Sequence, residues 1–144
     1  MRIVKDKIWT WFLPDEERTV NQQLWFDCGG KWLIFDRQEK ILKLAYKLEK
    51  FIDSGEIDSA KTWSGDPRAI NVYTLDKNCK KVNALLVQLG AKHHKVWEYD
   101  YAWDKNIRRP IDFLYSWLSK FITIIRSKGM HGTVELFKEL MTSD

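Results

Sequence analysis

The sequence has little of the residues that mark disulfide-stabilised, fibrous or membrane-spanning proteins. Its 144 residues include only two cysteines, three prolines and seven glycines. Two cysteines are too few for a disulfide framework, and so little glycine and proline excludes collagen-like and low-complexity chains. Cys28 and Cys79 are far apart and lie beside apolar residues, so we expect buried, reduced thiols. The most apolar segment, residues 111–125, is interrupted by polar side chains and is shorter than the roughly 20 residues of a membrane span.

Motifs that carry familiar chemistry are also missing. The chain contains no HExxH, no Cys/His cluster, no glycine-rich nucleotide loop and no G-x-S-x-G. Of the three histidines, His93 and His94 are adjacent and would point to opposite sides of a strand, while His131 stands in a glycine-flanked turn. We therefore expect no metal and no cofactor, and nothing in the sequence identifies a base for a cysteine nucleophile.

Composition indicates a folded domain. Hydrophobic residues make up 44% and charged residues 31% of the chain, which excludes wholesale disorder. The length and the absence of a linker predict a single domain over residues 1–144. Because the first residues lack the apolar stretch of a signal peptide, we expect a soluble, cytoplasmic protein without a membrane partner. The net charge of +4 is compatible with an anionic partner but does not require one.

Hydrophobic periodicity predicts alternating strands and helices. The expected strands are residues 7–13, 24–27, 31–35, 58–64, 69–75 and 95–103, with a turn at Gly29-Gly30 and a hairpin turn over 64–68. One helix begins at Asp36, where Glu39 completes a capping-box pattern, and ends at Gly55; a second begins near Asp76 or Asn78 and ends at Gly90. A helical extension follows over 110–141. This order predicts an α+β fold with a mainly antiparallel sheet and helices packed on one face.

Aromatic residues are abundant, with eight Trp, five Tyr and seven Phe. In the expected strand 95–103 four of them alternate, so they share one face: Trp97, Tyr99, Tyr101 and Trp103. Such a row could form a platform on which bases stack, or it could be the core face of the sheet beneath a helix. The core alternative is favoured, and it would place Glu98 and Asp100 on the other side of the sheet.

The expected hairpin interleaves cations and rings. Lys61 and Trp63 share a face of the first strand, Arg68 lies at the turn, and Tyr73 belongs to the second strand. A cation beside a flat ring suits a phosphorylated or nucleotide ligand. The alternative is a solvated lysine whose stem covers a core tryptophan. The sequence leaves the hairpin register open, and with it the relation of Tyr73 to Lys61.

Several short strings resemble a family of unknown function named for the basophilic-leukaemia-expressed protein. They are Gly-Lys-Trp-Leu-Ile-Phe at 30–35, Ser-Ala-Lys-Thr at 59–62, Ile-Asn-Val-Tyr-Thr-Leu-Asp at 70–76 and Leu-Gly at 89–90. The resemblance covers about residues 30–103. It implies a fold similar to the cap-binding translation initiation factor, in which a curved antiparallel sheet carries helices on its convex side.

The resemblance also implies candidate residues and a second chemistry. Lys31, Lys61, Arg68 and Tyr73 match positions where relatives have similar residues near the concave sheet face. The family is distantly similar to phosphothreonine lyases, which use a Lys base and a His acid beside cations that hold phosphate. Lys61 would be that base, but position 63 is Trp and no His lies nearby in the sequence.

We therefore predict a non-enzymatic binding module for a nucleotide, an RNA end or another phosphorylated ligand. One alternative is an enzyme on a phosphorylated substrate with Lys61 as the base. Another is a protein–protein interaction module that docks through residues 111–125. The candidate ligand-binding residues are Lys31, Lys61, Trp63, Arg68, Tyr73, Trp97 and Tyr99.

Overall fold

The computed structural model describes residues 1–101. The expected helical extension 110–141, the apolar segment 111–125, Trp103 and His131 lie outside the described residues. The strand predicted over 95–103 ends earlier, at Tyr99, because residues 100–101 form a turn.

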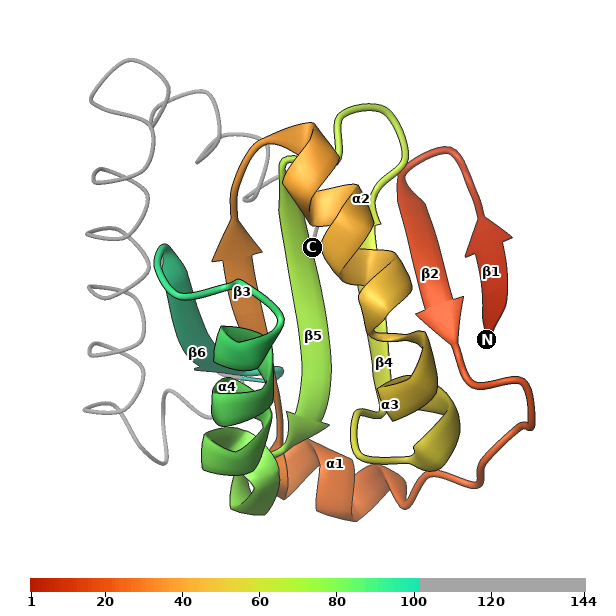
Figure 1. Cartoon of the computed structure of the whole chain (residues 1–144). Helices are drawn as coiled ribbons and strands as arrows, with labels where there is room; N and C mark the ends of the chain where they lie inside the picture. Colours follow the sequence, from red (N-terminus) through yellow and green to blue (C-terminus); the bar gives the residue numbers. More distant parts are fainter. Residues whose placement is uncertain (102–144) are drawn as a thin grey trace.

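The described chain forms a six-stranded antiparallel sheet in the order β1-β2-β4-β5-β3-β6 (Figure 1). The strands are β1 (Arg2–Lys5), β2 (Trp9–Leu13), β3 (Gly29–Phe35), β4 (Ser59–Trp63), β5 (Ala69–Leu75) and β6 (Lys95–Tyr99). The helices are α1 (Gln22–Cys28), α2 (Gln38–Lys47), α3 (Glu49–Ser54) and α4 (Cys79–Gln88), with a short 3-10 helix at Asp76–Asn78. The predicted α+β class with an antiparallel sheet is confirmed.

Three helices, α2, α3 and α4, lie over one side of the sheet, and α1 crosses one end of it (Figure 1). We call the side beneath α2, α3 and α4 the helix face, and the opposite side the aromatic face. Because side chains alternate along a strand, each strand contributes to both faces. None of the helices within residues 1–101 has the length and apolar character needed to cross a membrane.

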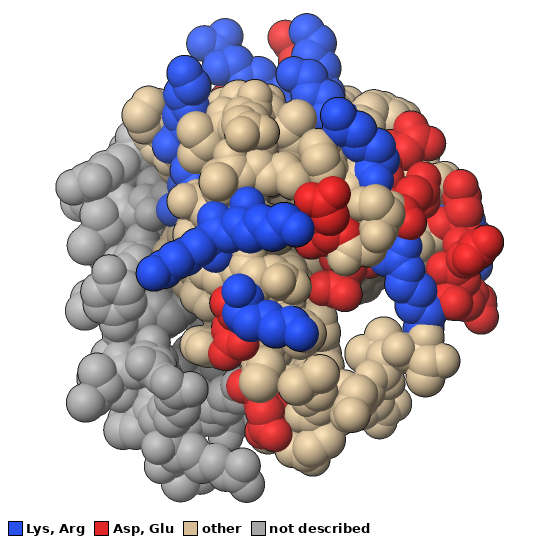
Figure 2. Space-filling model, turned by 60° about the horizontal axis from the view of Figure 1, so that its bottom comes forward, with Lys and Arg blue, Asp and Glu red and all other residues tan. Residues whose placement is uncertain are grey.

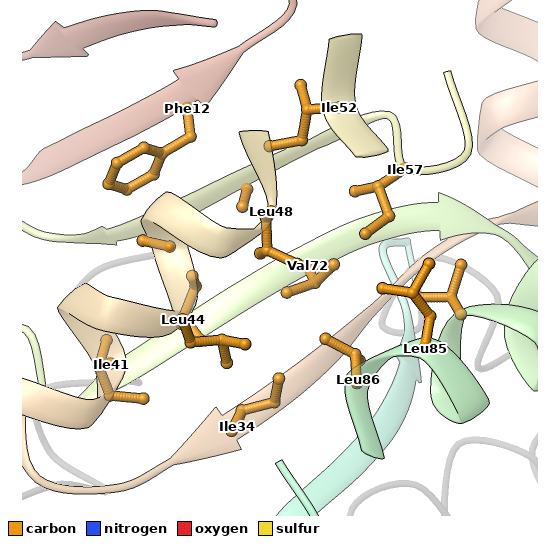
Figure 3. Packing of buried hydrophobic residues seen from close by; sticks show 14 residues of the cluster. Phe12, Ile34, Ile41, Leu44, Leu48, Ile52, Ile57, Val72, Leu85 and Leu86 are labelled. Carbon is orange, nitrogen blue, oxygen red and sulfur yellow. The ribbon is translucent and has the colours of Figure 1, made fainter. Parts of the chain in front are cut away.

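The hydrophobic core fills the space between the helix face and the helices (Figure 3). The strands contribute buried Phe12, Ile34, Ala60, Ile70 and Val72, and the helices add residues spaced by three or four: Ile41, Leu44, Leu48, Ile52, Val82, Leu85 and Leu86. That spacing places them along one stripe of each helix. Full burial of such a side chain contributes about 1.5–3 kcal/mol, so this layer is the main source of stability.

The helix expected over residues 36–55 is divided in two. Leu48 separates α2 from α3, and Gly55 ends α3 in the left-handed conformation (φ 86°), as its position predicts. The predicted capping box at Asp36 is wrong, because α2 begins two residues later at Gln38. The Asp36 carboxylate instead accepts a hydrogen bond from the Arg37 backbone N–H at 2.7 Å.

Residues 24–27 are helical, which corrects the predicted short strand. Asn21 caps α1, since its side chain accepts a hydrogen bond from the Leu24 N–H at 3.0 Å. Gly29 and Gly30 begin β3 and do not form the predicted turn. Their lack of a side chain has a different reason: the ring of Trp25 crosses Gly29, and the ring of Trp97 crosses Gly30, where a Cβ would collide with either.

One edge of the sheet is a hairpin that the sequence did not predict. β1 pairs with β2, and the Asp6 side chain orders the turn by accepting hydrogen bonds from the Ile8 and Trp9 N–H groups, both at 2.7 Å. Acidic side chains collect on this flank, on the right of Figure 2. They surround the N-terminal ammonium, which lies 2.7 Å from Asp15 and 2.9 Å from Asp53.

Candidate functional site

The aromatic face concentrates rings and cations from three neighbouring strands. Trp9 and Trp11 lie on β2, Lys61 and Trp63 on β4, and Tyr73 on β5. The register pairs Trp9 with Trp63 and Trp11 with Lys61. The β4–β5 register pairs Ser59 with Tyr73. Because Ser59 and Lys61 are two residues apart on β4, Tyr73 lies on the same face as Lys61, which the sequence had left open.

The Lys61 ammonium lies among three of these rings. Its Nζ atom is 3.8 Å from the ring centroid of Trp9, 4.9 Å from that of Trp11 and 5.9 Å from that of Tyr73. All three distances are within the range of a cation–π interaction, and tryptophan gives the strongest one. The rings also stack in pairs: Trp9 with Trp63 at 6.3 Å, and Trp11 with Tyr73 at 6.0 Å between centroids. Except for Tyr73, these side chains are half-buried.

A second polar group lies beside the rings, on β3 and β6. Lys31 is only 8% exposed, and its Nζ atom is 3.6 Å from Asp100 Oδ1. The same carboxylate accepts a hydrogen bond from the Trp25 indole N–H at 2.9 Å. Glu98, also 8% exposed, pairs with Lys31 in the sheet register. The predicted placement of Glu98 and Asp100 opposite Trp97 is therefore confirmed.

Trp97 and Tyr99 belong to the helix face. Trp97 packs edge-on against Trp32, which contacts the core, and the Tyr99 hydroxyl donates to Asp76 at 3.1 Å. These contacts support the core alternative for Trp97 and Tyr99, whereas Tyr101 lies in a turn after β6 and is 40% exposed. Both side chains are separated by the sheet from Lys31, Lys61, Trp63 and Tyr73.

Arg68 occupies a third location. Its side chain pairs with Asp66 in the same turn, with an Nη2–Oδ2 distance of 2.6 Å, and it lines a cavity beside the start of α2. That cavity does not include Lys61 among the described residues around it. The seven predicted ligand-binding residues therefore divide among two sheet faces and one turn.

Three residues of this site escaped the sequence analysis. Trp9 and Trp11 share a face, which the alternation predicts, but β2 pairs with a strand that follows much later in the chain. The sequence assigned Trp25 no place, because the predicted strand over 24–27 is part of helix α1, which places this ring 6.3 Å from that of Tyr73 between centroids. The signal in the sequence that could have indicated this helix is Asn21, a residue type that often caps helices, in front of residues 22–28.

Two pKa shifts bear on the chemistry of this part of the chain. Backbone hydrogen bonds from Trp9 and Ile8 lower the pKa of Asp6, and the positive charge of Lys61 adds to the effect. Burial, together with the nearby Asp76 carboxylate, raises the pKa of the Cys79 thiol to about 11. Cys79 is thus protonated at neutral pH and unsuited to act as a nucleophile. Both cysteines are free and half-buried, where full burial was expected.

Among residues 1–101, no three His, Cys, Asp or Glu side chains come together in a way that could hold a metal ion. No protein-family model, curated protein or solved structure matches the chain. The resemblance to the basophilic-leukaemia-expressed family therefore stays a prediction, as does the cap-binding-like form of the fold.

Proposed function

We propose that this protein is a non-enzymatic binding module whose aromatic face takes a ring-bearing, phosphorylated ligand such as a nucleotide or an RNA end. One observation carries the proposal: the Lys61 ammonium lies among the rings of Trp9, Trp11 and Tyr73. A flat ring surface and an adjacent cation are the two components that such a ligand needs.

Binding would exchange one set of contacts for another. A cation over a ring contributes about 0.5–2 kcal/mol. A stacked base contributes about 1–3 kcal/mol, and the ammonium moved off the ring gains a charge-assisted bond to phosphate. The exchange therefore favours a ligand that has both a ring and a phosphate over one that has either alone.

The acidic residues on the aromatic face would determine the orientation of a bound ligand. Glu98 and Asp100 are carboxylates on the same face, and Asp100 already accepts a hydrogen bond from the Trp25 indole. Carboxylates accept hydrogen bonds from amino groups of a base edge and repel phosphate. A ligand would thus direct its phosphate to Lys61 and its base toward β3 and β6.

The test is a fluorescence titration of the full chain with nucleoside monophosphates and short single-stranded RNA at low and at physiological salt. Stacking on Trp9 or Trp11 should quench tryptophan emission, and affinity should rise as salt falls, because phosphate contacts displace counterions. Lys61→Met keeps the apolar stem but removes the charge, so it should weaken binding of phosphorylated ligands more than binding of nucleosides.

Lys5→Met is the matched control, because Lys5 is exposed on β1 at the edge of the sheet. Unchanged emission with every ligand at low salt would contradict the proposal. Equal loss of affinity in Lys61→Met and Lys5→Met would show that only overall charge matters, which contradicts it too.

The enzyme alternative has less support from the geometry. A lyase of the resembled type needs a His acid near the Lys base, but His93 and His94 line the cavity beside α2 that Lys61 does not border. The discriminating experiment is incubation with phosphothreonine peptides, followed by mass spectrometry. Release of phosphate that Lys61→Met abolishes would favour the enzyme over the binding module.

A further inference from the structure

A cavity of about 640 Å³ lies where β3 ends and α2 begins, and its described lining includes neither Lys61 nor the tryptophans around Lys61. Its volume is within the range of about 300–1,000 Å³ that small-molecule sites occupy. The side chains around it come from three separate parts of the chain: the start of α2, the turn before β5 and the connection between α4 and β6. We refer to it as the cationic cavity.

Positive charge dominates its described lining. The cationic residues of the described lining are Arg37, Lys40, Arg68 and Lys92, beside His93 and His94, and its carboxylate is that of Asp36. Asp36 offsets only part of this charge, with its Oδ2 atom 3.8 Å from Lys40. Arg68 is paired with Asp66, which leaves Arg37 and Lys92, both exposed, as the cations best placed to meet a ligand.

The start of α2 adds to the same field. Arg37 is the N-cap residue but makes no side-chain capping bond, so no side chain caps the first turn of this ten-residue helix. Its N–H groups and the positive end of the helix dipole favour an anion. A smaller groove between α2 and α4 continues from the cavity and carries Lys43 and Lys47 along its rim.

The connection between α4 and β6 is held against the end of β3 by a strained residue. His94 has a φ of 55°, and its carbonyl accepts a hydrogen bond from the Phe35 N–H at 3.0 Å. This left-handed conformation is adopted mainly by glycine, and His is one of the few other residue types in which it is enriched. Backbone strain of this kind gathers at binding sites. Here it brings Lys92, His93 and His94 to the cavity that Arg37 and Arg68 also line.

The distribution of acids leaves this corner positive. Asp15, Glu49 and Asp53 surround the N-terminal ammonium on the β1 flank, whereas β6 is the opposite edge of the described sheet. Among residues 1–101 the cavity offers cations but no tryptophan, and Phe35, which borders it besides the two histidines, is 1% exposed. Its ligand is therefore chosen by charge and not by stacking.

We propose that the cationic cavity binds a chain of phosphate groups, such as inorganic tripolyphosphate or the triphosphate of a nucleotide. Separated cations from three segments suit several linked phosphates better than one, because each phosphate meets its own donor. This site is distinct from the aromatic face, and the proposal made for it does not depend on the function proposed for that face.

The test is isothermal titration calorimetry of the full chain at low salt with tripolyphosphate, orthophosphate and sulfate. Tripolyphosphate should bind, and the Arg37→Ala/Lys92→Ala double variant should lower its affinity by about tenfold or more, given the strength of charge-assisted hydrogen bonds. Lys5→Ala/Lys7→Ala removes two exposed cations of the β1–β2 hairpin and serves as the matched control with little expected effect.

A nucleoside triphosphate forms the second arm. Affinity equal to that of tripolyphosphate would assign recognition to the phosphate chain alone, and tighter binding that Arg37→Ala/Lys92→Ala still weakens would assign a nucleotide. Equal binding of sulfate and tripolyphosphate would overturn the proposal. So would full binding by the Arg37→Ala/Lys92→Ala variant, or loss of tripolyphosphate binding in Lys61→Met alone, which would place the phosphates on the aromatic face.

Discussion

The two faces of one sheet differ in what they bury. The helix face covers aliphatic side chains beneath three helices, and many of them have no exposed surface. The aromatic face buries a smaller apolar cluster of Leu33, Phe35, Ala69 and Val96, together with the charged residues Lys31 and Glu98. The same strands supply both through alternation. The larger cluster on the helix face therefore contributes most to stability, while the aromatic face combines a smaller cluster with buried charge and can hold a binding site.

The largest effect is expected where the helix face loses volume. Leu86 on α4 has no exposed surface, whereas Leu24 on α1 is 43% exposed. Leu86→Ala should lower the free energy of unfolding by about 2–5 kcal/mol because it leaves a cavity in the core. Leu24→Ala should cost less than about 1 kcal/mol. Urea denaturation of both variants measures the contrast, and equal losses would refute the assignment of stability to the helix face.

A middle-sized effect is expected at the two glycines that serve opposite faces. Added Cβ atoms would meet the Trp25 ring at Gly29 and the Trp97 ring at Gly30, so Gly29→Ala and Gly30→Ala should each cost about 1–3 kcal/mol. Gly65→Ala is the control, since nothing lies within 4 Å of its added Cβ. Thermal unfolding measures all three, and wild-type stability in either β3 variant would mean that the rings do not need these glycines.

A smaller effect concerns the strained turn at the cationic cavity. His94→Gly should be more stable than His94→Ala by about 1 kcal/mol, because only glycine adopts a φ of 55° without a steric cost. Both changes remove the same ring, so the comparison isolates the backbone. Chemical denaturation of the pair checks it. Equal free energies of unfolding for His94→Gly and His94→Ala would mean that the backbone at position 94 is not strained.

The smallest effect is the pH dependence of the hairpin that supplies Trp9 and Trp11. The pKa of Asp6 is lowered in the folded state, so its carboxylate stabilises the fold above the ordinary Asp pKa of about 3.9. That contribution is lost as pH falls through the lowered folded value.

The urea midpoint, measured from neutral to acidic pH, provides the test. The urea midpoint of Asp6→Ala should be lower than that of the wild type at neutral pH. The difference between the two midpoints should become smaller as the pH falls. Glu16→Ala, on the exposed loop after β2, is the control and should show no such convergence. A difference that does not depend on pH would exclude the Asp6 carboxylate as its cause.

Local patterns predicted most elements, and long-range pairing decided the site. Alternation gave the β4–β5 hairpin and the two sides of β6, because these depend on residues close in sequence. The capping box at Asp36 and the strand at 24–27 were wrong, since Arg37 is the N-cap residue of α2 and Asn21 caps a helix that includes residues 24–27. Lys61 could not be joined to Trp9 and Trp11 in advance, because nothing local indicates that β2 pairs with β4.

The β1–β2 hairpin has a consequence for how the aromatic face forms. In the described sheet β2 lies between β1 and β4, so its pairing with β4 connects the hairpin to the remaining strands. Contacts at this junction are distant in sequence: Thr10 and Ser64, which share a hydrogen bond, are 54 residues apart. Contacts so distant in sequence close slowly, and an edge hairpin with exposed β1 residues opens more readily than the central strands. Trp9 and Trp11 therefore belong to a hairpin whose amides we expect to exchange faster than those of the central strands, and a bound ligand would slow that exchange.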